Sequence, residues 1–88
     1  MNVRVSDRAL RHLAAIYEYI AYDSAEAVSR VVRRLQAAVR LLEEQPRMGR
    51  ESQLRRRREL IVEQYAIIYT IRRDEIVVET IVHGARRR

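Results

Sequence analysis

The chain has 88 residues, of which 48% are hydrophobic, and it contains two glycines and one proline; this excludes disorder and low complexity and predicts one domain. There is no cysteine and there are two histidines, which excludes disulfides and thiol redox chemistry and predicts no metal site and no cofactor. The 18 basic residues are all arginine and stand against 12 acidic residues, so the net charge of +6 indicates a polyanionic partner: an acidic protein segment, a nucleic acid, or a machine that handles one.

Residues 2–5 alternate in polarity and predict a short strand. Ser6 and Asp7 then supply capping side chains for a helix over 7–22. At 100° per residue, His12 falls on the solvent side of this helix. One broad apolar side is formed by Ala9, Leu10, Leu13, Ala14, Ile16, Tyr17, Ile20 and Ala21.

A second amphipathic helix is predicted over 24–44, with Asp23 as its cap and Glu26 completing a capping box. Leu41 lies at the edge of its polar side and is a candidate contact residue. The apolar side is formed by Ala27, Val28, Val31, Val32, Leu35, Ala38, Val39 and Leu42. Two apolar stripes joined by a tight turn predict an antiparallel helical hairpin.

Pro46 and Gly49 end the second helix, and the polarity pattern then changes to that of strands. Strands are predicted over 57–62, 65–71 and 76–82, with a turn at 72–75 between the last two. The order is β-α-α-β-β-β. We therefore expect an α+β domain spanning 1–88, in which a helical hairpin packs on a small, mostly antiparallel sheet.

Both faces of this sheet are rich in apolar side chains, since Ile67 and Tyr69 alternate with Ala66 and Ile68. Two helices of this length cover only one face, which predicts that a partner protein or a second copy covers the other. The alternative is that a few aliphatic side chains are simply exposed, which is common in proteins.

No spacing matches a phosphate-binding loop, a metalloprotease or a nucleophile elbow. His83 follows the last strand and either acts as a general acid or base or only closes the strand by bonding to backbone. The run Arg55–Arg58 either guards a sheet edge against aggregation or binds a polyanion. With no apolar stretch of 18 residues and no secretion signal, the sequence predicts a cytoplasmic protein without a membrane partner.

Four segments in order resemble the RelE/ParE superfamily of bacterial toxins from type II toxin–antitoxin modules, and the likeness runs through nearly the whole chain. They are the first helix; 46–50 (PRMGR), similar to P-x-x-G-R; 58–69 (RELIVEQYAIIY), similar to R-x-L-x-V-x-x-Y-x-I-x-Y; and 81–86 (IVHGAR), similar to the closing H-G-x-R. The resemblance implies a β-α-α-β-β-β fold, which agrees with the elements read from the residues.

The superfamily has two activities. RelE-like members are ribosome-dependent ribonucleases with basic residues on the sheet, whereas ParE-like members poison DNA gyrase by binding. This chain has no Lys, has Ala66 where many ribonucleases carry an arginine, and ends in a His-Gly-Ala-Arg segment rather than His-Tyr. The resemblance therefore implies a ParE-like gyrase inhibitor of the plasmid stabilisation type. The alternative is a RelE-like endoribonuclease acting through His83, Arg58 and Tyr65.

For the ParE branch, the resemblance implies a gyrase-binding surface at Arg58, His83, Arg86, Arg87 and Arg88, with direct nucleic-acid contact only at that target. It also implies an acidic, ParD-like antitoxin that folds onto the toxin and forms a hetero-oligomer with it. The residues expected to contact the antitoxin are Tyr17, Ile20, Leu35, Val39, Leu41, Tyr65, Ile67 and Tyr69.

Overall fold

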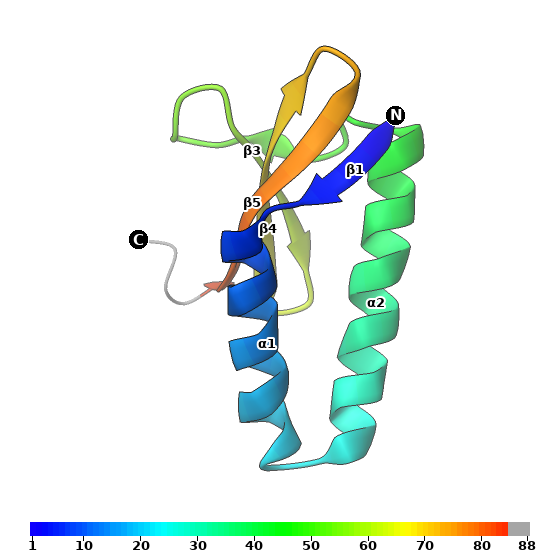
Figure 1. The fold of residues 1–88 in the computed structure, drawn as a ribbon, viewed down its shortest axis with the longest axis vertical. Helices are drawn as coiled ribbons and strands as arrows, with labels where there is room; N and C mark the ends of the chain where they lie inside the picture. Colours follow the sequence, from blue (N-terminus) through cyan, green and yellow to red (C-terminus); the bar gives the residue numbers. More distant parts are fainter. Residues whose placement is uncertain (85–88) are drawn as a thin grey trace.

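The computed structural model describes residues 1–84, which form two helices and a five-stranded sheet (Figure 1). In chain order the elements are β1 (Asn2–Val5), α1 (Asp7–Ala21), α2 (Ala25–Glu44), β2 (Arg50–Glu51), β3 (Arg58–Val62), β4 (Tyr65–Arg72) and β5 (Glu75–His83). Each expected element begins and ends within one residue of its predicted bounds. The two-residue strand β2 was not predicted, because so short a strand has no periodicity of its own.

The strand order is β1-β5-β4-β3-β2. β1 pairs with β5 in parallel, and the other neighbours are antiparallel. A parallel pair needs a long connection between its strands, and the segment from α1 to β4 supplies it. The α+β fold and the mostly antiparallel sheet are therefore confirmed.

Serine hydroxyls cap both helices. The Ser6 hydroxyl accepts the Ala9 N–H at 3.1 Å and donates to the Glu79 carbonyl at 3.0 Å, which fastens the start of α1 to β5. The cap of α2 is Ser24, whose hydroxyl accepts the Ala27 N–H at 3.2 Å. The prediction of Asp23 as that cap was wrong by one residue, because the turn after α1 extends one residue further.

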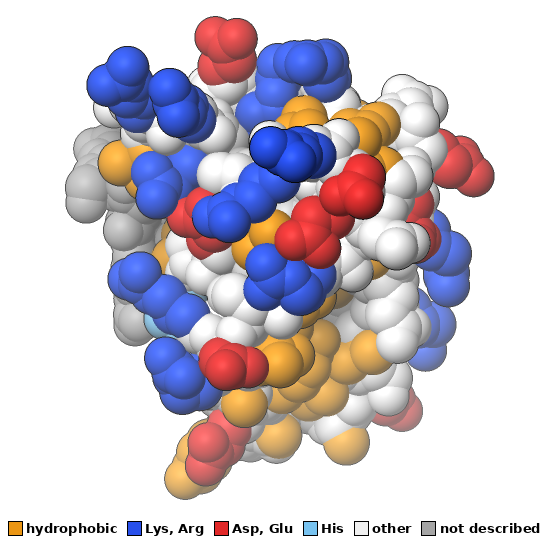
Figure 2. Space-filling model, turned by 45° about the horizontal axis from the view of Figure 1, so that its top comes forward, with side chains coloured by type: hydrophobic (Ala, Val, Ile, Leu, Met, Phe, Trp, Pro, Cys, Tyr) orange, Lys and Arg blue, Asp and Glu red, His pale blue; other side chains and the backbone are white. Residues whose placement is uncertain are grey.

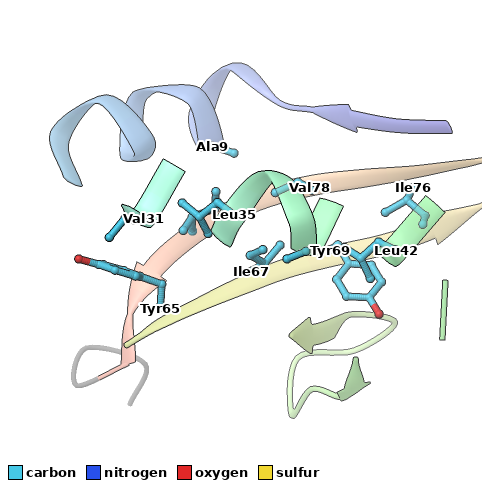
Figure 3. Packing of buried hydrophobic residues seen from close by; sticks show 11 residues of the cluster. Ala9, Val31, Leu35, Leu42, Tyr65, Ile67, Tyr69, Ile76 and Val78 are labelled. Carbon is cyan, nitrogen blue, oxygen red and sulfur yellow. The ribbon is translucent and has the colours of Figure 1, made fainter. Parts of the chain in front are cut away.

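The core lies between the helices and one face of the sheet (Figure 3). Leu35 and Leu42 of α2 pack with Ile67, Tyr69 and other strand residues. The fully buried large side chains are Tyr69, Leu42, Ile67, Ile76 and Val78.

The first helix is rotated slightly from the orientation that its polarity predicts. Leu10, expected in the apolar side, is 51% exposed, whereas His12, expected in solvent, is half-buried against β5. The Nδ1 atom of His12 lies 2.5 Å from the Thr80 hydroxyl. This contact and the Ser6 cap fix the rotation of α1 against β5.

The face of the sheet away from the helices is less bare than expected, although Ile61, which pairs with Ala66, is 46% exposed. Ala66, Ile68 and Val77 lie outside the helix-side core, yet their exposures are only 0%, 6% and 5%. Part of the cover comes from an ion pair that crosses β4, in which the Arg57 Nε lies 2.7 Å from the Glu79 carboxylate on β5. Glu79 is the extra residue of a β-bulge, since Ile68 pairs with Thr80 and Tyr69 with Val78.

Candidate functional site

Arg58, at the start of β3, is held by the backbone of the loop that precedes β2. Its Nη1 atom donates to the Gly49 carbonyl at 2.6 Å and to the Arg47 carbonyl at 3.4 Å. Its strand partner Tyr69 bonds the same loop, because the Tyr69 hydroxyl donates to the Pro46 carbonyl at 2.8 Å. The segment similar to P-x-x-G-R is thus fixed to the sheet by two side chains.

Burial raises the pKa of Tyr69, while the Gly49 N–H bonded to its hydroxyl and the nearby Arg58 charge act in the opposite direction. The Tyr69 phenol is therefore a structural hydrogen-bonding group, neutral at ordinary pH.

His83 lies at the far end of β4 and β5. It pairs with Tyr65 across the two strands, and the two rings meet edge to face with centroids 5.7 Å apart. The Nε2 atom of His83 lies 3.1 Å from the Gln64 side-chain oxygen. The pKa of Tyr65 is raised by burial first, and then by the charges of Glu63 and Tyr19.

The three residues of the ribonuclease alternative are not brought together. Tyr65 and His83 are neighbours, but Arg58 pairs with Tyr69, four residues further along β4. At about 3.3 Å per residue, this places Arg58 roughly 13 Å from the His83 end of the sheet. A proton-transfer pair and a fixed cation that act on one phosphate are expected to lie close together, and the register of β3, β4 and β5 does not make Arg58 a neighbour of the Tyr65–His83 pair.

Sequence reasoning missed His12 as a member of a site. A hollow of about 560 Å³ between α1 and the end of β5 is lined by His12, Ile16, Tyr19, Tyr65, Ile81 and His83, among others. The sequence gives only a weak indication that His12 lines this hollow, because its position depends on the rotation of α1 rather than on any spacing along the chain.

The residues expected to contact an antitoxin divide into two groups. Leu35, Tyr65, Ile67 and Tyr69 are buried in the chain's own core, with exposures of 8% or less, so a partner does not reach most of their surface in this conformation. Tyr17, Ile20 and Val39 are half-buried, and Leu41 is exposed. Burial also raises the pKa of Tyr17.

Tyr17 of α1 and Val39 of α2 both line an open groove between the two helices. The groove has a volume of about 450 Å³, and Leu35 and Ile67 belong to its apolar lining. Gln36 and Arg40 of α2 add polar groups to the lining. Four of the eight expected contact residues therefore line one groove.

Arg86, Arg87 and Arg88 lie outside the described residues, so the structure does not place this part of the expected target-binding surface. Within residues 1–84, no helix combines the length and apolar character needed to cross a bilayer. In the same range, no three His, Asp or Glu side chains gather as metal ligands.

Comparison with known proteins gives three findings. A family model described as "ParE toxin of type II toxin-antitoxin system, parDE" matches residues 3–88. The Sinorhizobium fredii protein named "Putative toxin Y4kP" is 40% identical over 85 residues, which cover 94% of this chain and 88% of that protein. A chain of the solved structure "Chromosomal ParDE TA system from P. aeruginosa" has the same fold, with a TM-score of 0.83 at 23% identity, over 94% of this chain and 95% of that chain.

Proposed function

The chain belongs to the ParE toxin family of type II toxin–antitoxin systems, and from this premise we propose that it binds DNA gyrase and holds the cleaved gyrase–DNA intermediate. On this proposal the toxin acts by binding and does not itself cut nucleic acid. A cognate acidic antitoxin of the ParD type neutralises it.

The observation that carries the proposal is the separation of Arg58 from the Tyr65–His83 pair. Arg58 pairs with Tyr69, whereas His83 pairs with Tyr65, so the two candidate halves of a ribonuclease site lie at opposite ends of the β3–β4 pairing. In addition, residue 66 is Ala, at the sheet position where the resemblance implies an arginine in many ribonuclease members. These features favour a binding toxin over a ribonuclease within the superfamily.

The groove between α1 and α2 fits an amphipathic, acidic segment of the proposed antitoxin. Its lining is mostly aliphatic and aromatic, which suits the apolar side of an amphipathic segment. Arg40 belongs to the lining, and Arg33 is exposed on the same helix, so carboxylates of the segment would meet permanent cations. We therefore place the antitoxin in this groove rather than on the opposite face of the sheet.

The experiment is an induction of the full chain in two bacterial strains, one with ordinary gyrase and one with a toxin-resistant gyrase. Covalent gyrase–DNA complexes and the SOS response are measured beside the rate of protein synthesis. We expect the complexes to accumulate before synthesis falls, and only in the first strain.

A parallel reaction uses purified full chain with gyrase and supercoiled plasmid, and with programmed ribosomes carrying mRNA. Cleaved DNA trapped on gyrase supports the proposal. Cuts in mRNA at codon positions, with no trapped DNA, would instead establish the ribonuclease alternative.

A further inference from the structure

An arginine-lined hollow lies at the end of the molecule where β3 begins. It has a volume of about 370 Å³, and its polar lining comes from Arg47, Glu51, Ser52, Arg56, Arg57 and Arg58. Figure 2, with the top of the Figure 1 view turned forward, shows basic side chains over much of the upper part of the face that it draws, with carboxylates between them. The hollow is distinct from the groove assigned to the antitoxin.

Arg58 is the fixed cation of this hollow. Its side chain is 19% exposed and is held by the carbonyls of Gly49 and Arg47, which orient the guanidinium without neutralising it. The carboxylate of Glu51 forms an ion pair with it at 3.9 Å and is itself 87% exposed. The positive charge of Arg58 is therefore only weakly compensated.

The neighbouring arginines differ in their pairing. Arg57 is bound to Glu79, so its charge is already compensated. Arg47 and Arg56 are exposed and form no ion pair with any residue in the range 1–84. Of the four guanidinium groups that line the hollow, the three other than that of Arg57 thus share it with one loosely held carboxylate.

We infer that this hollow binds backbone phosphates of a nucleic acid, with Arg58 as the fixed contact and Arg47 and Arg56 closing on the same group. Guanidinium donors match phosphate oxygens in geometry, and several uncompensated cations in one hollow suit a ligand with closely spaced charges. Exposed Arg72 and Arg73 follow at the β4–β5 turn, at the same end of the sheet, and continue the positive surface. An acidic peptide is the competing occupant that the test must separate.

This inference deepens the proposed function by adding a DNA contact. It rests on that function only in one respect, namely that gyrase brings the DNA to the toxin. It would give the toxin its own contact with the DNA that gyrase holds. Binding of the chain to DNA is measurable without gyrase. A failure of the phosphate-binding inference can therefore be told apart from a failure of the gyrase proposal.

The test measures binding of the full chain to a fluorescein-labelled 20-base-pair duplex by anisotropy over a series of salt concentrations. The variant is Arg47→Ala with Arg56→Gly. Arg56 has a φ of 61°, a conformation that glycine adopts without strain, so this change does not threaten the fold. The control is Arg8→Ala with Arg11→Ala, which removes the same charge from the exposed surface of α1.

We expect the Arg47→Ala, Arg56→Gly double variant (the hollow variant) to bind the duplex several-fold more weakly. The slope of log K against log salt concentration should become shallower by about two, because two phosphate contacts are removed. The control variant should keep most of the affinity and most of the salt dependence of the wild type. Equal losses in the two double variants, or no loss in the hollow variant, would overturn the site. Tighter binding of labelled poly-glutamate than of the duplex, lost in the hollow variant, would overturn its assignment to nucleic acid.

Discussion

The backbone N–H of Gly49 donates to the phenolic oxygen of Tyr69 at 2.9 Å, and the same hydroxyl donates to the Pro46 carbonyl. One buried tyrosine on β4 thus closes the loop between α2 and β2. The loop in turn presents the carbonyl groups that hold Arg58. The arginine hollow therefore depends on a tyrosine that does not line it.

Gly49→Ala should destabilise the fold by about 3 kcal/mol, because a methyl group would meet well-packed atoms. An added Cβ would lie 2.6 Å from the Tyr69 hydroxyl and 2.8 Å from the Glu59 carbonyl. Gly84→Ala is the matched control, since its Cβ would lie no closer than 3.1 Å to Gln64. Urea unfolding measures both; equal midpoints for the two variants would contradict the packing argument.

Thr70→Val should stabilise the protein by about 1 kcal/mol. The Thr70 hydroxyl oxygen is buried and has no hydrogen-bond partner among the described residues, so an apolar group of the same shape removes a desolvation cost. Thr80→Val is the control, because the Thr80 hydroxyl bonds to His12 and its loss should destabilise. Thermal unfolding of the two variants should shift in opposite directions; shifts of the same sign would argue against this assignment.

Alkaline pH should destabilise the wild type more than Tyr69→Phe. Burial raises the pKa of Tyr69 above its ordinary value of 10.0, so the folded state keeps a proton that the unfolded state releases. This contribution to stability is fully present below pH 10 and is lost as the pH rises through the raised pKa.

The measurement is the free energy of unfolding of both proteins from pH 8 to the alkaline limit of the assay. Part of the slope should persist in Tyr69→Phe, because the pKa values of Tyr17 and Tyr65 are raised as well. Superimposable pH profiles would show that Tyr69 does not titrate with unfolding.

Val39→Asp, in the groove between α1 and α2, should weaken binding of the proposed acidic antitoxin by at least about tenfold. It puts a carboxylate into an apolar contact and adds repulsion toward an acidic partner. Tyr22→Asp is the control, because Tyr22 is 89% exposed at the end of α1 and does not line the groove. Calorimetry with the proposed acidic antitoxin gives both affinities; equal losses would place the antitoxin elsewhere.

Much of the fold could be predicted from the sequence because helix and strand periodicity is a local property. The apolar stripes of residues 7–22 and 24–44 and the alternation around Tyr65–Tyr69 produced the observed elements to within one residue. The resemblance of the 46–50 and 58–69 segments likewise pointed to the family that the comparisons show. These conclusions need only neighbours along the chain.

What the sequence alone determined is therefore the order of elements, the family and a surface of permanent positive charge. Only the tertiary structure decided which residues meet: His12 against Thr80, Arg57 across β4 to Glu79, and Arg58 away from His83. These contacts join segments 68 and 22 residues apart in the first two cases. Helix rotation, a β-bulge and strand register set them, and all three arise from packing between elements, which no local pattern records.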